Sequence, residues 1–137
     1  MEQKIGCLVK GIHEKIKCKM DAELKSRNIT MSQGRIIAYL SRNGNTATQK
    51  QIESFLGISH PSVVGIISRM ERNGHIICTI DENDRRNKIV SLTPSAIDLR
   101  KDIDKYTTQC EKEMLSGFTE EERESLFKML DAIYQSL

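Results

Sequence analysis

The chain has 137 residues, of which 38% are hydrophobic and 29% charged, with a formal net charge of only +2. This length predicts one domain that buries its own core, and the near-neutral charge excludes a protein that is basic over its whole surface. Three tyrosines, three phenylalanines and no tryptophan argue against a stacking platform for single-stranded nucleic acid or sugars. No apolar run has the length of a membrane span, and Met1 to Lys10 lacks the apolar region of a signal peptide, which predicts a cytoplasmic protein.

The four cysteines predict free thiols rather than a disulfide framework or a metal site. They are widely spaced and include no C-x-x-C pair, and the three histidines are equally scattered. The sequence also shows no nucleophile–base pair and no Gly-rich phosphate loop. We therefore expect no metal, no cofactor and no catalytic activity.

Helical segments dominate both ends of the chain. Apolar residues at three- and four-residue steps from Ile5 to Leu24 predict one long helix that ends near Asn28. Capping boxes, in which a Thr and a Gln or Glu three residues later exchange hydrogen bonds with the backbone, predict three further helix starts. They lie at Thr30–Gln33, Thr48–Gln51 and Thr119–Glu122.

The segment from Ser59 to Lys88 has the strongest functional pattern. Ser59 is a helix N-cap, and a Pro follows in the first turn. The apolar stripe of the helix is formed by Val63, Ile66, Ile67 and Met70, and Asn73-Gly74 ends it. The link Gly57-Ile-Ser59 joins this helix tightly to the preceding one, which is typical of a helix-turn-helix.

A two-stranded ribbon and two more helices are predicted next. The strands are Ile76–Ile80 and Lys88–Leu92, joined by a polar loop from Asp81 to Asn87, and Thr93-Pro94 starts a long helix. The expected fold is mainly α with a small two- to three-stranded β-ribbon, in the order α-α-α-α-β-β-α-α. Residues 32–92 form the expected DNA-binding lobe, and residues 1–31 and 93–137 form a helical region.

The helices of residues 1–31 and 93–137 carry more apolar surface than the small lobe can cover. Leaving these side chains in water forfeits about 1.5–3 kcal/mol each, so we expect the chain ends to dimerise. Residues 1–40 carry eight basic and four acidic side chains, whereas residues 94–137 carry six basic and ten acidic ones. These opposite charges suit packing of the two ends together, and they equally suit two independently solvated faces.

A helix followed by a ribbon with an arginine tip can lie in a DNA groove and contact the flanking backbone. Gly65 lies on the polar face of the helix, where it either allows close approach to DNA or is a neutral surface residue. In the loop, Asp84 is expected to brace one arginine so that the other enters the minor groove, the alternative being a solvated loop. The candidate DNA-binding residues are Thr48, Gln49, Gln51, Ser59, His60, Ser62, Gly65, Arg69, Asp84, Arg85 and Arg86.

These features together resemble the MarR family of winged helix-turn-helix transcriptional regulators. The resemblance rests on the T-x-x-Q start at Thr30, the run ISHPSVVGIISRMERNGHI, the DENDRRNKIVSLT ribbon and the long final helices. It implies a winged helix-turn-helix core flanked by long dimerisation helices, namely the first, fifth and sixth. Ser59–Asn73 would then be the recognition helix, with Asp84, Arg85 and Arg86 at the wing tip. It further implies a homodimeric repressor that releases a pseudo-palindromic operator of double-stranded DNA when a phenolic or other amphipathic ligand binds.

Two departures from the family pattern and two alternatives accompany this interpretation. Cys78 and Thr79 stand where many members have basic residues, and Leu92-Thr-Pro-Ser-Ala96 replaces the frequent L-T-x-x-G. One alternative is a redox-sensing regulator that uses Cys7, although residues 1–30 contain no tyrosine to help activate it. The other is a winged helix used only as a protein-interaction module, without DNA binding.

Overall fold

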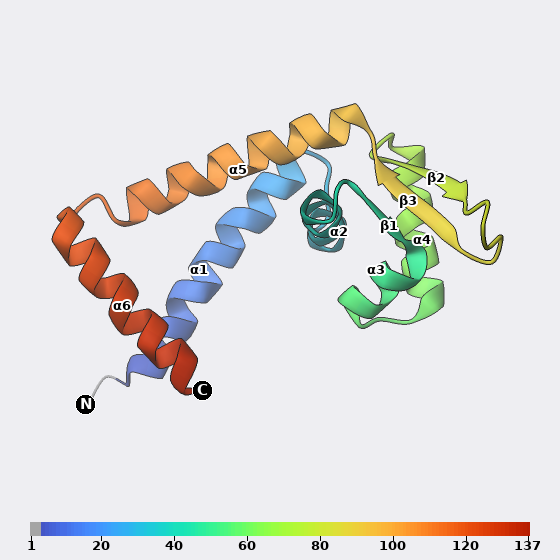
Figure 1. The fold of residues 1–137 in the computed structure, drawn as a ribbon. Helices are drawn as coiled ribbons and strands as arrows, with labels where there is room; N and C mark the ends of the chain where they lie inside the picture. The colour runs from blue at the N-terminus through green and yellow to red at the C-terminus, as the bar shows by residue number, and fades with distance from the viewer. Residues whose placement is uncertain (1–3) are drawn as a thin grey trace. The chain divides into compact units, whose positions relative to one another are not determined.

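The structure is a computed structural model and describes residues 4–137 (Figure 1). It divides into two compact units, Met1–Ile103 and Asp104–Leu137. Its elements are α1 (Ile5–Ser26), α2 (Met31–Arg42), β1 (Thr46–Thr48), α3 (Gln49–Leu56), α4 (His60–Arg72), β2 (Ile76–Ile80), β3 (Lys88–Leu92), α5 (Pro94–Met114) and α6 (Glu120–Ser136). The predicted class, mainly helical with a small ribbon, is confirmed.

The first unit holds one hydrophobic core. An antiparallel sheet in the order β1-β3-β2 packs with α2, α3 and α4, and Val90 at its centre is fully buried. The core reaches beyond the predicted lobe of residues 32–92, because Leu24 of α1 and Ile103 of α5 belong to it. The division into a DNA-binding lobe and a helical region therefore stays a functional prediction.

Local capping signals start the helices as the sequence predicts. Both hydrogen bonds of the capping box are present at Thr30, Thr48 and Thr119. Ser59 caps α4 by accepting a hydrogen bond from the Ser62 backbone N–H at 3.4 Å. Each capped helix end thereby satisfies a backbone donor that the helix itself cannot pair.

The predicted order of elements omitted β1. This strand is only three residues long, and the alternation of Thr46, Ala47 and Thr48 is too short to predict a strand. It exists because it pairs with β3, where Ala47 is opposite Val90. Such a pairing lies more than 40 residues away along the chain, so no local signal announces it.

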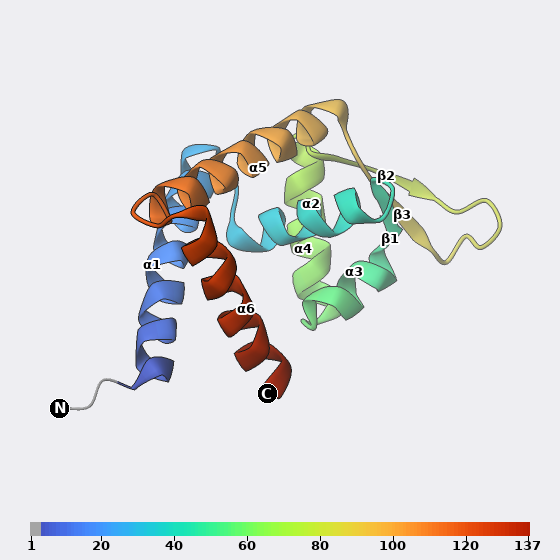
Figure 2. The same ribbon diagram turned by 60° about the vertical axis from the view of Figure 1, so that its left-hand side comes forward.

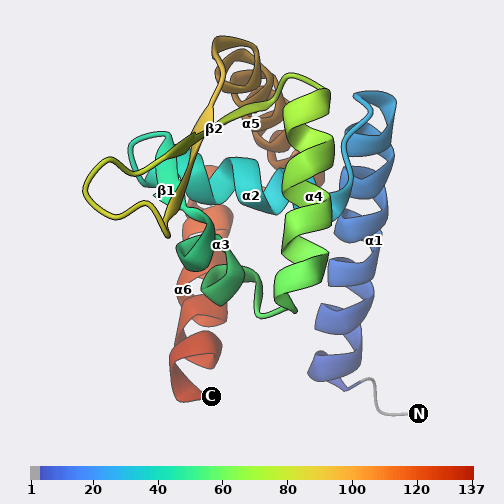
Figure 3. The ribbon, with the colours of Figure 1, turned by 90° about the vertical axis from the view of Figure 1, so that its right-hand side faces the viewer.

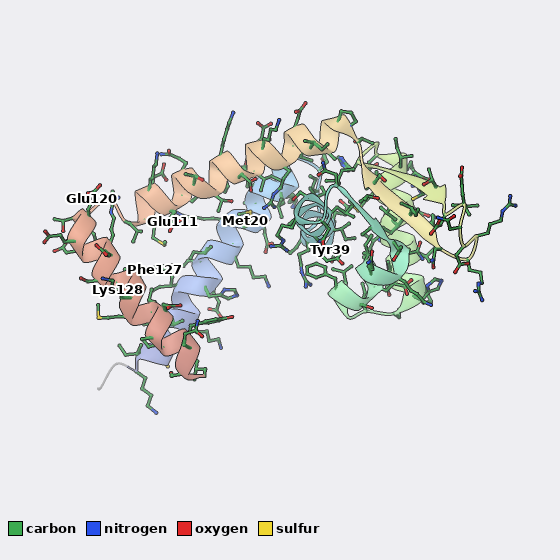
Figure 4. All side chains as sticks on the ribbon, viewed as in Figure 1. Met20, Tyr39, Glu111, Glu120, Phe127 and Lys128 are labelled. Atoms are coloured by element: carbon green, nitrogen blue, oxygen red, sulfur yellow. The ribbon has the colours of Figure 1, made fainter. Side chains whose placement is uncertain are left out.

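Apolar side chains remain exposed on both units. In α1 only Leu24 is buried, whereas Ile5, Leu8, Ile12 and Ile16 are 44–63% exposed. In the second unit α6 buries no residue, and Phe127, labelled in Figure 4, is 70% exposed. The turn before α6 is held by Arg123, whose side chain donates to the Leu115 carbonyl at 3.2 Å.

Candidate DNA-binding surface

Helix α4 separates its apolar and polar residues cleanly. Val63, Ile67 and Met70 are fully buried, and α4 packs on α3 and β2. In Figure 3, no element of residues 4–103 lies in front of α4. The side that faces away from the core carries Ser62, Ser68, Arg69 and Arg72, all exposed. These side chains are hydrogen-bond donors, so this face can bind phosphates or base edges.

Gly65 lies beneath the Arg69 side chain on this face. A methyl group placed at Gly65 would meet the Arg69 guanidinium at 3.8 Å, which is ordinary van der Waals contact. Packing therefore does not require a glycine here, although glycine costs about 1 kcal/mol relative to alanine in a helix interior. The space that it leaves lies beside a charged, exposed side chain.

His60 begins α4 and is tied to the preceding helix. Its Nδ1 hydrogen-bonds the Glu53 carboxylate, which also accepts from the Gln49 side-chain amide at 3.2 Å. Partial desolvation opposes ionisation of Glu53, but the hydrogen bonds from His60 and Gln49 outweigh it and lower the pKa of this carboxyl. The Glu53–His60 pair links α3 to α4, and sequence reasoning missed it because the partners lie seven residues apart on different helices.

The three candidates at the start of α3 have different surroundings. Thr48 and Gln51 form the capping box, which uses the amide oxygen of Gln51 and leaves its N–H groups able to donate outward. Gln49 differs from expectation because it is only 9% exposed and donates to Glu53. Its amide oxygen is buried without a hydrogen-bond partner. Its burial argues against contact between Gln49 and DNA, which stays a prediction.

The loop between β2 and β3 projects beyond the helices of the first unit (Figure 2). Asp84 accepts from both the backbone N–H and the Nε of Arg86, at 3.1 and 3.2 Å. This is the expected brace, and the structure assigns Arg86 as the braced arginine. Arg85 is exposed beside it and makes no such bond. Arg85 is therefore the cation placed to reach outward.

A second link, between α4 and the ribbon, was not visible in the sequence. Glu71 accepts a hydrogen bond from the Cys78 backbone N–H at 3.1 Å and another from the Cys78 thiol. Because β2 is an edge strand, this bond satisfies a backbone donor that no neighbouring strand pairs. Burial and the Glu71 hydrogen bond raise the pKa of the Cys78 thiol to about 11.

A stacked aromatic pair joins α3 to α2. Tyr39 of α2, labelled in Figure 4, stacks on Phe55 with ring centroids 4.4 Å apart, and the Arg35 guanidinium lies 5.2 Å from the Phe55 centroid. A shallow hollow between α3 and the ribbon loop is lined by Tyr39, Thr48, Lys50, Gln51, Ser54, Phe55, Asp84 and Asn87. The stack thus packs α3 against α2, and α3 borders the same hollow as the ribbon loop.

Comparison with known proteins identifies this arrangement. A model of the MarR family matches residues 27–87. YwoH, an uncharacterised HTH-type transcriptional regulator of Bacillus subtilis, is 32% identical over 114 residues, which cover 81% of this chain and 82% of YwoH. The chain belongs to the MarR family. It is a helix-turn-helix transcriptional regulator that binds DNA, and the family is not one of enzymes.

Solved structures of a similar regulator match nearly the whole chain. MepR, a transcription regulator of the Staphylococcus aureus multidrug efflux pump MepA, is 27% identical, with 98% of both chains covered and a TM-score of 0.89. The S. aureus MepR–DNA complex is 28% identical, again with 98% of both chains covered, and has a TM-score of 0.73. The predicted winged helix-turn-helix fold with its long flanking helices is therefore confirmed.

Two further features of residues 4–137 concern metal ligands and membrane-spanning helices. Within this range, no group of three or more His, Cys, Asp or Glu side chains is placed to hold a metal ion. None of the helices in the same range combines the length and apolar character needed to cross a bilayer. Cys7, the candidate redox residue, is an exposed free thiol on α1, and redox sensing stays a prediction.

Proposed function

We propose that this MarR-family protein is a homodimeric repressor that binds a pseudo-palindromic operator and releases it when a small phenolic or other amphipathic ligand binds. The observation that carries the proposal is the division of α4 into a buried apolar stripe and an exposed polar face. A helix held in this way can present its donors to the major groove without rearrangement. The relative MepR has been solved in complex with DNA.

The proposed DNA contacts divide into three groups. Ser59, His60, Ser62 and Arg69 would enter the major groove, where an arginine can bind guanine through two hydrogen bonds, and Gly65 would allow the close approach. Thr48 and Gln51 would bind the phosphate backbone. Arg85, with Arg86 braced by Asp84, would enter the minor groove. The alternative of a winged helix that only binds other proteins is set aside, because the chain belongs to a DNA-binding family.

A homodimer is supported by the exposed apolar side chains of α1 and α6. Five of them on α6, namely Phe127, Met129, Leu130, Ile133 and Tyr134, are 45–77% exposed. Monomeric proteins rarely expose so much apolar surface in one place. A second copy of the chain would cover it, and two-fold symmetry would then present two copies of α4 to one duplex. In this proposal, residues 1–31 and 93–137 form the dimerisation region.

Transcription in vitro tests the direction of regulation. The template would carry a promoter whose DNA the protein itself selects from its own genome. Repression is the expected result, because a dimer bound over the promoter excludes the polymerase. Stimulation would contradict the repressor assignment while leaving DNA binding intact, and one relative, BadR of Rhodopseudomonas palustris, is named a transcriptional activatory protein.

Release by a ligand is tested with a panel of phenolic and other amphipathic compounds. A compound that binds the folded protein raises its melting temperature. The same compound should lower the affinity for the operator, because binding of ligand and DNA is then coupled negatively. Compounds that stabilise the protein without changing operator affinity would contradict the release step.

A further inference from the structure

The Glu53–His60 hydrogen bond determines which form of the His60 ring can contact DNA. His60 stands at the first residue of α4, and its side chain is 67% exposed, whereas the Glu53 side chain is 21% exposed. We propose that His60 contacts a DNA phosphate as an imidazolium oriented by Glu53, so that each bound α4 takes up a proton. This inference rests on the proposed function, because it requires α4 to face DNA.

The hydrogen bond to Glu53 determines where the ring hydrogen of His60 lies. An ionised carboxylate offers only lone pairs, so the Nδ1 of His60 must carry the hydrogen that it shares with Glu53. The hydrogen bonds described above keep Glu53 ionised. In the neutral ring, Nε2 is then left with a lone pair and can only accept a hydrogen bond.

Phosphate oxygens are acceptors only, so they cannot pair with this neutral form. A neutral His60 would direct its Nε2 lone pair at the negatively charged phosphate, which is repulsive. The imidazolium carries a hydrogen on each nitrogen, so it donates to Glu53 through Nδ1 and to a phosphate through Nε2. Glu53 would be a positioning residue that holds the ring through Nδ1 and leaves Nε2 for the phosphate.

The other charged groups around α3 do not replace His60 as a hydrogen-bond partner of Glu53. Lys50 on the same helix helps to lower the pKa of Glu53 through its charge, as a smaller cause than the hydrogen bonds from His60 and Gln49. From α2, Arg35 lies over the Phe55 ring, and from the ribbon loop Asp84 lines the hollow that Lys50 also lines. The hydrogen bonds to the Glu53 carboxylate come from Gln49, which is neutral, and from His60.

The test is operator affinity against pH. Fluorescence anisotropy at constant salt would be measured between pH 5.5 and 8.5, with a duplex selected by the protein from its own genome. Wild-type affinity should fall as pH rises, by at most about tenfold per pH unit for each proton taken up. His60→Gln should bind more weakly at low pH and lose the pH dependence. His13→Gln, which changes an exposed histidine of α1, is the control and should keep it.

Glu53→Gln separates positioning from a general structural role. The Gln amide can donate to Nδ1 as well as accept from it, so a neutral His60 ring can then carry its hydrogen on Nε2 and donate it to the phosphate. The fall in affinity with rising pH should therefore become shallower, with circular dichroism unchanged. A wild-type affinity that is flat with pH, or one that rises, would overturn the inference and favour a neutral His60 that accepts from a base amino group. Absence of duplex binding at every pH would instead refute the proposed function.

Discussion

Helices α4 and α6 are built alike, but they expose opposite faces. Each begins at a Ser or Thr N-cap and carries an apolar stripe at three- and four-residue spacing. In α4 the stripe residues are at most 9% exposed, whereas Leu130 and Ile133 of α6 are 47% and 45% exposed. The fold thus buries the apolar face of α4 in the core and leaves its polar face exposed. On α6 it is the apolar face that remains exposed.

The core of α4 gives the largest expected effect on stability. Replacing the fully buried Ile67 with Ala should lower the free energy of unfolding by about 2–5 kcal/mol, because apolar burial is reduced and a cavity is left behind. Val64 lies on the same helix and is 37% exposed, so Val64→Ala should cost under about 1 kcal/mol. Urea denaturation of both variants measures the difference. Equal destabilisation would show that the faces of α4 do not differ as described.

The apolar face of α6 is tested by Leu130→Asp. In a dimer this change buries two unpaired carboxylates and removes two leucines, so the dimer dissociation constant should rise more than about 100-fold. Sedimentation velocity measures the oligomeric state, and operator affinity should fall with it. Lys128→Ala, which removes an exposed lysine paired with Glu124, is the control and should remain dimeric. A Leu130→Asp protein that stays dimeric would place the interface elsewhere.

The two arginines of the ribbon loop should contribute unequally to DNA binding. Arg85→Ala should weaken operator binding about tenfold and reduce the slope of log affinity against log salt by about 0.9 for each phosphate that the arginine no longer neutralises. Arg86→Ala should have the smaller effect, because it removes a brace to Asp84 rather than the outward cation. Anisotropy titrations at several salt concentrations compare them. A weaker affinity for the Arg86 variant than for the Arg85 variant would reverse the assignment of the two roles.

How much of this surface the sequence could predict depends on whether its signals are local. The cap at Ser59, the stripe from Val63 to Met70 and the three capping boxes are local patterns, and all were predicted correctly. The Glu53–His60 and Glu71–Cys78 hydrogen bonds depend on how separate elements meet, so no spacing rule reveals them. Burial of Gln49 was missed for the same reason, since a polar residue near a helix start is usually exposed.

The hydrogen bond between Glu71 of α4 and Cys78 of β2 gives the smallest expected effect, a change in the reactivity of the Cys78 thiol. A thiol with a pKa of about 11 is about one part in a thousand ionised at pH 8, so Cys78 should react slowly with iodoacetamide. Glu71→Ala removes the hydrogen bond that favours the neutral thiol, and alkylation of Cys78 should become faster. Mass spectrometry of digested samples follows the rate at each cysteine. A rate at Cys78 unaffected by this substitution would assign its slow reaction to burial alone.

The most direct test of the account is a footprint on DNA that the protein selects from its own genome. Two copies of α4 related by a two-fold axis predict two inverted half-sites with centres about 10–10.5 base pairs, or one helical turn, apart. Wild-type protein should protect both half-sites together, and Leu130→Asp should lose both together. Protection of a single half-site, or half-sites in direct rather than inverted repeat, would contradict a symmetric dimer that reads DNA with α4.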